Sequence, residues 1–288
     1  YYGERYAYLY QGNYNFNLDN SVVFGIERED DQMGLNNNAG GRVDSNAYVT
    51  SQFFDYQSRI TNNIYGTIGA RFDEHSLAGG TGSNEDSHRA TLAYVFDDKT
   101  TKLKSSYGTG YRFPSLYELK YVYRAGSATL PFVKAETSQS YDFGIEKSIS
   151  PNLFIDLTYF NVKYFDALEG WKANTAGGSS STQNTIATVK SQGIELMSKY
   201  KLNELFNFGL NYTYTSSYDG ADEDNPSNSN SGSQMVRVPR NLINLITNIK
   251  VPAYKNLDIS LRTKWSDKVR DYGNGNATSD KSPGFQNE

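Results

Sequence analysis

The stretch Tyr141-Asp142-Phe143-Gly144-Ile145-Glu146 alternates large apolar side chains with small or acidic ones. A side-chain period of two places Tyr141, Phe143 and Ile145 on one face of a β-strand, with the polar residues on the other. A helix would mix the two kinds of side chain around its surface. The stretch therefore predicts a strand with one apolar and one polar face.

The same alternation recurs on both sides of this stretch, as in Ala90–Phe96, Phe208–Tyr214 and Leu257–Trp265. Segments 46–56 and 153–164 alternate less cleanly, so the facing of their side chains stays open. We expect twelve strands, near 4–15, 20–28, 46–56, 62–72, 88–97, 100–111, 139–148, 153–164, 186–200, 206–216, 240–250 and 256–266.

The connections between these strands alternate between short and long. The short ones lie near Asn17–Asp19, Gln57–Thr61, Asp97–Lys99, Ser150–Asn152, Asn203–Leu205 and Pro252–Lys255. The long ones lie at 29–45, 73–87, 112–138, 165–185, 217–239 and from 267 to the end. Such alternation puts all short turns at one end of the sheet, as in an outer-membrane barrel. A soluble sandwich, with its Greek-key crossovers, has no reason to sort its connections by length.

Composition agrees with a membrane barrel. Hydrophobic residues make up 37% of the chain and aromatic residues 14%, while the mean hydropathy is -0.66. A transmembrane helix needs about 20 consecutive apolar residues, and the sequence has no such run. Backbone groups in lipid must all be paired, so strands that cross a bilayer have to close into a barrel. We predict an all-β fold, a transmembrane antiparallel up-and-down β-barrel.

Other features exclude some function classes. The chain has no Cys, which rules out disulfides and thiolate sites. Its net charge is -4 and it has no basic stripe, so nucleic acid is not an expected partner. Many predicted strands end in an aromatic residue that could belong to an interfacial girdle, namely Tyr10, Phe72, Phe96, Tyr111 and Trp265.

Two segments near the middle carry a family signature. Residues 108–119, with Arg112-Phe113-Pro114-Ser115-Leu116-Tyr117-Glu118-Leu119, precede residues 134–146, which open Lys134-Ala135-Glu136-Thr137-Ser138. Together they resemble the TonB-dependent outer-membrane receptors, whose strands carry Arg-x-Pro-Ser-Leu-x-Glu-Leu and Lys-Pro-Glu-Thr-Ser patterns. Residues 193–196 and 237–240 are similar to further strand starts of that family. The departures are Tyr111, Phe113, Ala135 and the altered segment 129–133.

The resemblance implies a fold and an activity. Members form a barrel of about 22 strands, closed by an N-terminal plug domain. About 12 strands and no plug or TonB box are visible, so residues 1–288 are expected to be a partial barrel domain. The implied function is active transport of a large scarce nutrient across the outer membrane of a Gram-negative bacterium. Its partners would be TonB, reached through the plug, the nutrient, outer-membrane lipid and lipopolysaccharide.

The nutrient and the function class stay open. Among family ligands the motif style favours cobalamin, with a ferric siderophore second and haem third. A passive porin or an adhesion barrel without energy coupling is the main alternative. An outer-membrane hydrolase is a third hypothesis, which would need a Ser or Asp within reach of a histidine. The full-length gene separates these, because a plug with a TonB box supports active transport.

The resemblance also marks site residues. Ligand contacts are expected in the extracellular loops 29–45, 73–87, 112–138, 165–185 and 217–239. The motif residues are expected to be structural, with Pro114 ending the strand and the charged groups joining loop to barrel wall or plug through hydrogen bonds. These residues are Arg112, Pro114, Glu118, Glu136 and Ser138.

The remaining polar groups have simpler interpretations. His75 and His88 are expected to be solvated loop residues, neither catalytic nor haem-binding. No resident cofactor or metal is expected, although the acidic loop 219–225 and Glu29-Asp30-Asp31 could hold Ca²⁺. The polar faces should line a hydrated lumen and neutralise a plug surface, through Arg71, Arg89, Lys102, Lys104, Asp142, Glu146, Glu195, Lys199, Arg262 and Lys264.

Overall fold

The computed structural model describes most of the chain. It covers residues 2–36, 42–77, 82–116, 118, 134–173, 180–184, 188–219, 234–254, 257–272, 278–281 and 286–287. Strands account for nearly all of this, and no described helix is long and apolar enough to cross a membrane.

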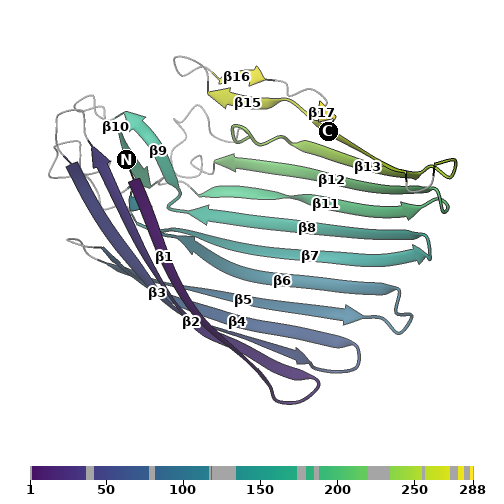
Figure 1. The fold of residues 1–288 in the computed structure, drawn as a ribbon, viewed down its shortest axis with the longest axis horizontal. Helices are drawn as coiled ribbons and strands as arrows, with labels where there is room; N and C mark the ends of the chain where they lie inside the picture. Colours follow the sequence, from purple (N-terminus) through teal and green to yellow (C-terminus); the bar gives the residue numbers. More distant parts are fainter. Residues whose placement is uncertain are drawn as a thin grey trace.

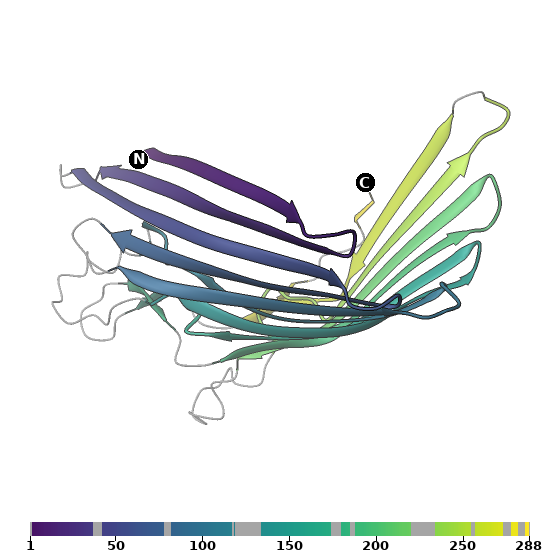
Figure 2. The same ribbon diagram turned by 90° about the horizontal axis from the view of Figure 1, so that it is seen from below.

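One antiparallel sheet forms the body of the molecule. Its order is β1-β2-β3-β4-β5-β6-β7-β8-β11-β12-β13-β14-β17, so each long strand pairs with the next long strand along the chain. Figure 2 shows that the sheet curves into a trough, with β1 and β14 far apart at its two sides. The long strands are β1 (Tyr2–Asn15), β2 (Asn20–Asn36), β3 (Arg42–Arg59), β4 (Ile64–Leu77), β5 (Ser83–Val95), β6 (Thr101–Arg112), β7 (Glu136–Ser150), β8 (Leu153–Phe165), β11 (Val189–Lys201), β12 (Phe206–Asp219), β13 (Asn241–Lys250) and β14 (Asp258–Ser266).

The smaller elements lie in the long connections. β9 (Leu168–Ala173) and β10 (Ser180–Asn184) form a hairpin between β8 and β11, and β15 (Val269–Tyr272) pairs with β16 (Thr278–Lys281) after β14. β17 (Gln286–Asn287) adds two residue pairs to the edge of β14.

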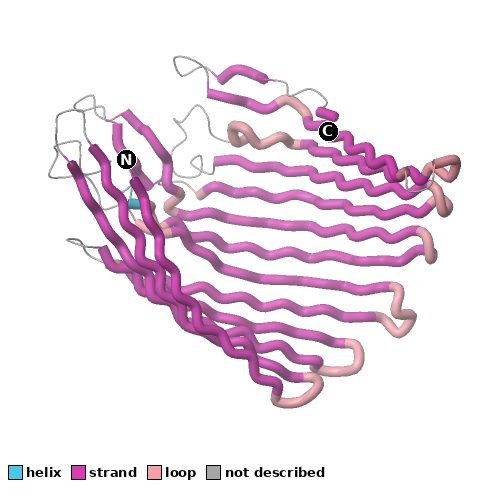
Figure 3. The backbone as a smooth tube through the Cα atoms, in the orientation of Figure 1, coloured by secondary structure: helices cyan, strands magenta, loops and turns pink. Residues whose placement is uncertain are grey.

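All tight turns gather at one end of the sheet. They lie at the right in Figures 1 and 3, whereas the longer connections and the hairpin β9–β10 lie at the opposite end. Local side-chain hydrogen bonds stabilise the tight turns. For example, Asp98 Oδ1 accepts hydrogen bonds from the backbone N–H groups of Thr100 and Thr101. This confirms the predicted antiparallel up-and-down β architecture. The predicted alternation of short and long connections holds only in part, because residues 37–41 join β2 to β3 and residues 78–82 join β4 to β5, so both of these connections are short. We call the end that carries the long connections the outer rim.

Several strands extend further than the sequence predicts. Residues 29–45 were expected to form a loop, yet β2 and β3 pair from Asn20↔Ser58 up to Asn36↔Arg42. The expected loop 73–87 is likewise mostly strand, in β4 and β5, and 165–185 contains the hairpin β9–β10. The reason is that β-propensity depends on context. Polar segments rich in Asp and Asn extend as strands here because a neighbouring strand already holds the register.

The apolar residues form continuous rows on one face. Directly opposed residues share a face and contact one another, and one row crosses eight strands through Tyr94, Leu103, Ile145, Leu157, Leu196, Tyr212, Ile243 and Trp265. Many side chains on this face are exposed, with Phe143 at 56% and Leu261 at 54%. A broad face of exposed aromatic and aliphatic groups is unfavourable in water and suits contact with lipid.

The opposite face is polar and more covered. Gly144 is buried between exposed Phe143 and Ile145, because side chains converge on the concave side of a curved sheet. Several charges on this face pair with each other at 2.6–2.9 Å, so the wall itself supplies part of their neutralisation; their contact with a plug surface stays a prediction. The pairs are Arg71 with Glu27 and Asp73, Arg89 with Asp55, Lys102 with Glu146, and Lys104 with Asp156.

The predicted aromatic girdle needs one correction. Tyr10, Phe72 and Phe96 are exposed. Tyr111 instead lies half-buried beside Asp73 and Arg71. The pairing of β6 with β5 ends at Gly108, so Tyr111 lies beyond the paired part. Tyr111 therefore belongs to the polar interior of the outer rim.

Candidate functional site: a junction at the outer rim

The central motif begins where β6 ends. β6 ends at Arg112, and buried Pro114 follows after Phe113. Proline has no N–H for the sheet ladder and a fixed φ, so pairing stops here. Ser115 then caps a helical turn: its backbone N–H donates to Glu118 Oε2 at 2.7 Å, and the Glu118 N–H donates to Ser115 Oγ at 3.2 Å. This reciprocal arrangement is a capping box.

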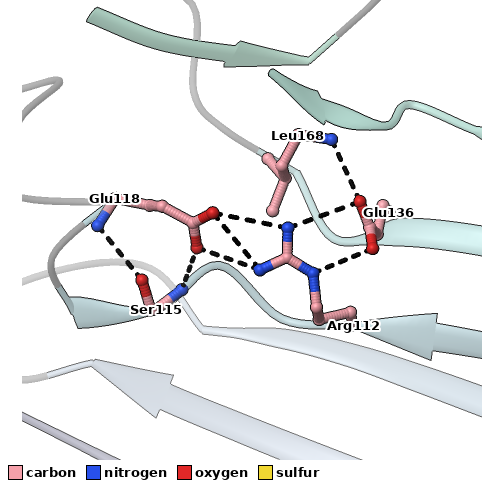
Figure 4. Close-up of polar contacts among 5 residues, drawn as sticks. All are labelled: Arg112, Ser115, Glu118, Glu136 and Leu168. Carbon is pink, nitrogen blue, oxygen red and sulfur yellow. Dashed lines mark hydrogen bonds and ion pairs between the residues drawn. The ribbon is translucent and has the colours of Figure 1, made fainter. Parts of the chain in front are cut away.

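Arg112 joins this turn to the sheet. Its Nη1 donates to both carboxylate oxygens of Glu118 at 3.1 and 3.2 Å, while its Nε donates to Glu136 Oε1 at 2.8 Å. Figure 4 shows the guanidinium lying between the two carboxylates. Arg112 and Glu136 are also direct register partners on β6 and β7. The planar guanidinium can serve both carboxylates at once because it offers five N–H donors.

Glu136 reaches a third segment. Its Oε2 accepts the backbone N–H of Leu168, the first residue of β9, at 3.0 Å (Figure 4). One carboxylate therefore contacts β6 and the hairpin β9–β10 while belonging to β7. We use the term rim junction for Arg112, Ser115, Glu118, Glu136 and the Leu168 N–H.

A ring stack holds the same turn to β4, which is two strands away from β6 in the sheet. Phe113 stacks on His75 of β4, with ring centroids 4.4 Å apart and ring planes 15° apart. His75, Pro114 and Leu116 are all buried. The imidazole that meets Phe113 is therefore shielded from solvent. The connection after β6 thus folds back onto β4 at the outer rim.

The rim junction carries one excess negative charge, from one guanidinium and two carboxylates. Burial by itself would raise the pKa of both carboxyls. The pKa of Glu118 is nonetheless below its usual value because the Ser115 N–H and Arg112 donate to it. Arg112 and the Leu168 N–H lower the pKa of Glu136 in the same way. Both carboxylates are therefore ionised at neutral pH and act as acceptors.

The motif residues are distributed as follows. The structure brings Arg112, Glu118 and Glu136 together, and it places Pro114 directly beside them in the chain. Ser138 lies apart from the charged groups, two residues further along β7, opposite Gly110. These contacts fix the base of a loop, which is a positioning task. Within the described ranges, no group of three or more His, Cys, Asp or Glu side chains could hold a metal ion.

The histidines differ from the expected solvated loop residues. His75 is buried in β4. His88 lies in β5, with its Nε2 2.6 Å from Asp86 Oδ2, and both side chains are about half exposed. The carboxylate that the hydrolase hypothesis required is thus present beside His88. In the described part of the chain, no Ser hydroxyl hydrogen-bonds either imidazole, so the nucleophile of that hypothesis is not seen.

The acidic segments also need comment. Glu29, Asp30 and Asp31 lie in β2 and are ion-paired: Asp31 with Arg5 at 2.6 Å, Asp30 with Arg28 at 3.0 Å. They do not form an open carboxylate cluster. Successive strand residues point to opposite faces, so Asp30 points away from Glu29 and Asp31, which share Arg5. Residues 220–225 lie outside the described residues, so calcium binding there stays a prediction. Most of loops 112–138 and 217–239 likewise lies outside the described residues, so ligand contacts there stay a prediction.

Sequence reasoning missed three parts of the site. The Ser-x-x-Glu spacing of Ser115 and Glu118 is a readable capping-box signal. The Leu168 N–H and the stack of His75 on Phe113 have no sequence signal, because the fold alone brings these segments together.

Comparison with known families identifies the chain. A family model described as "TonB dependent receptor-like, beta-barrel" matches residues 1–287. The chain belongs to this family. The family comprises transport receptors of the Gram-negative outer membrane and is not a family of enzymes. No curated protein matches the receptor chain in sequence.

Solved structures of similar fold support the assignment of the architecture. The ferric enterobactin receptor of Pseudomonas aeruginosa, PfeA, is 20% identical, with a TM-score of 0.76 over 98% of this chain and 45% of its own. The iron transporter FrpB of Neisseria meningitidis is 13% identical (TM-score 0.73; 99% and 47% covered). The copper transporter OprC is 13% identical (TM-score 0.70; 93% and 45% covered). The receptor chain thus spans less than half the length of each of these proteins.

Proposed function

We propose that this chain forms part of the barrel of a receptor that imports a large, scarce nutrient across the outer membrane with energy supplied through TonB. The match of the family model to residues 1–287 carries the proposal. The sheet supports it: one face suits lipid, the other suits a hydrated lumen, and the long connections share one rim.

A ferric siderophore is the nutrient we favour. The similar structures include a receptor for ferric enterobactin and another for ferripyoverdine, whose chain is 14% identical to this one. Cobalamin, which the motif style favoured, gains no support from the neighbours named here. The copper transporter and the two siderophore receptors have a metal in their cargo in common.

Import of a scarce ligand across the outer membrane requires energy. A scarce ligand must be held tightly to be captured, and a tightly held ligand leaves slowly. The outer membrane has no ATP and no ion gradient of its own, so the release step requires work done from the inner membrane. TonB is the partner that we propose for this step, acting through the plug domain that the family resemblance implies.

The test is uptake by cells that carry or lack the complete gene. Radio-iron-labelled ferric enterobactin and ferripyoverdine, and radiolabelled cobalamin, are offered at low concentration, with and without a protonophore and in a strain lacking TonB. We expect saturable uptake of a ferric siderophore that needs the gene, the proton gradient and TonB.

Four outcomes would overturn the proposal in part or as a whole. Gene-dependent uptake that persists without TonB would indicate a passive porin, and gene-dependent cell attachment without uptake would indicate an adhesion barrel. Uptake of cobalamin alone would retain active transport but replace the cargo. Fractionation of the gene product with inner membrane would reject the whole assignment.

A further inference from the structure

Three parts of the chain meet at the rim junction or directly beside it. The connection after β6 supplies the capped turn of Ser115 and Glu118, and the connection after β8 supplies the Leu168 N–H. Near the end of β4, His75 receives the ring of Phe113. These contacts join segments that are 32 and 38 residues apart in the sequence, so the fold creates them.

The Leu168 contact is unusual within the hairpin β9–β10. Leu168 is opposite Asn184 in the hairpin register, yet its N–H is used by the Glu136 carboxylate. Charge-assisted hydrogen bonds of this type are stronger than neutral ones. The carboxylate is fixed in turn, because Arg112 Nε holds its other oxygen at 2.8 Å. The hairpin is therefore fastened to an anchored group.

We infer that Glu136 is a positioning residue, which fixes the hairpin β9–β10 relative to the turn after β6 so that the two connections present their surfaces to a ligand as one unit. The part that concerns ligand rests on the proposed transport function. The mechanical part concerns only the receptor, and can be tested without any ligand.

The mechanical test uses distances between spin labels in the full-length receptor reconstituted in lipid. This chain has no Cys, so Cys substitutions at Ser181 in β10 and at Asn152 in a tight turn provide the two attachment sites for the spin labels. We expect a narrow distance distribution in the parent protein. Glu136→Ala should broaden it at least twofold, because the hairpin loses its anchor.

A second variant attacks the same contact from the other side. Leu168→Pro removes the donor N–H and leaves Arg112, Glu118 and Glu136 intact; Pro is tolerated at the first residue of a strand. It should broaden the distribution as Glu136→Ala does. Glu136→Gln keeps an acceptor oxygen for Leu168 and should rescue most of the narrow distribution.

A matched control separates positioning from general loosening. Glu146→Gln changes another carboxylate on β7 that is paired with a lysine, Lys102, far from the hairpin. It should leave the distribution unchanged. Unchanged distributions in both Glu136→Ala and Leu168→Pro would overturn the inference, and so would equal broadening by Glu146→Gln.

Uptake kinetics test the part of the inference that concerns ligand. With ferric enterobactin or ferripyoverdine as probe, whichever the parent takes up, Glu136→Ala and Leu168→Pro should raise the KM for uptake severalfold and leave the maximal rate within twofold. A fall in the maximal rate at constant KM would overturn the ligand part. If neither probe is taken up, the proposed function fails while the distance result still decides the positioning role.

Discussion

Arg112 shows how one side chain can convert a strand end into a rigid support. Its guanidinium faces Glu118 from the following turn and Glu136 from the neighbouring strand. About half of the Arg112 side chain is exposed, so each ion pair alone would add little to stability. The pairs gain from the backbone N–H donors of Ser115 and Leu168, which make the geometry specific.

The junction should therefore respond to acid. Both carboxyls have a pKa below 4.5, so the stability that they contribute is fully present above that value and is lost as the pH falls through the lowered pKa. We expect hydrogen-exchange protection of the Ser115 and Leu168 amides, corrected for intrinsic exchange, to fall by about tenfold on acidification.

The Lys99 amide is the control for this experiment. It donates to the carbonyl oxygen of Phe96 at 2.9 Å and should keep its protection as the pH falls. Arg112→Gln should shift the loss at Ser115 and Leu168 to higher pH, because the carboxyl pKa values rise without the cation. If the protection of all three amides falls together on acidification, a local role for the junction is contradicted.

At the scale of elements, each strand has to satisfy two environments at once. Leu157 of β8 lies in the apolar row between Ile145 and Leu196 and is 41% exposed. Thr213 of β12 lies on the polar face opposite Glu195. The same substitution at these two places therefore tests which face meets lipid.

We predict that Leu157→Arg destabilises the receptor by about 2–4 kcal/mol, the usual cost of a cation near the middle of a bilayer on a barrel's lipid face. Thr213→Arg should cost less than about 1 kcal/mol because the new cation meets water and Glu195. Urea titration of the receptor in vesicles, followed by tryptophan fluorescence, measures both. Equal costs would contradict the assignment of the faces.

Gly193 is one of the positions at which glycine permits a close approach between strands. A Cβ on Gly193 of β11 would lie 1.9 Å from the backbone oxygen of Tyr214 and 2.8 Å from Phe160 Cζ. On Gly209 of β12, the nearest atom to such a Cβ is Ile246 Cβ at 3.7 Å, an ordinary contact. The two glycines form a matched pair.

Gly193→Ala should lower the yield of folded receptor severalfold, because a backbone atom cannot move aside as the end of a side chain can. Gly209→Ala should fold as the parent does, and could gain slightly from a less flexible unfolded chain. The heat-modifiable band on unheated gels reports folded protein. A normal yield for Gly193→Ala would show that β12 shifts easily.

At the scale of the whole molecule, the sheet has two long sides that other strands must cover in lipid. Among the described residues, β1 pairs on one side only, with β2, and β14 has just two residues of β17 on its outer side. Unpaired N–H and C=O groups are costly in hydrocarbon. The curved sheet therefore needs further pairing to be stable in a membrane.

We predict that residues 1–288, expressed alone and refolded in detergent, give neither a heat-modifiable band nor a protease-resistant core. The complete gene product under the same conditions should give both. A resistant, heat-modifiable product from residues 1–288 would show that the two edges can pair with each other or between copies.

Much of the architecture was predictable because it depends on local periodicity. Alternation in segments such as Tyr141–Glu146 specifies the faces, and Asp, Asn and Pro at the tight turns specify where strands reverse. Strand lengths at the outer rim were not predictable in this way. The segment Glu29–Asn36 is mostly polar, and it forms a strand because it pairs with β1 and β3.

The sequence alone determined the fold class, the order of the strands, the faces of the clearest strands and the motif that marks the family. Periodicity and turn chemistry depend on residues close together in the chain, so they can be recognised in the sequence. The tertiary structure decided that Glu136 accepts the Leu168 N–H, that Phe113 stacks on buried His75, and that wall charges such as Lys104 and Asp156 neutralise each other. Those contacts depend on strand register and curvature, which arise only when distant segments are hydrogen-bonded into one sheet.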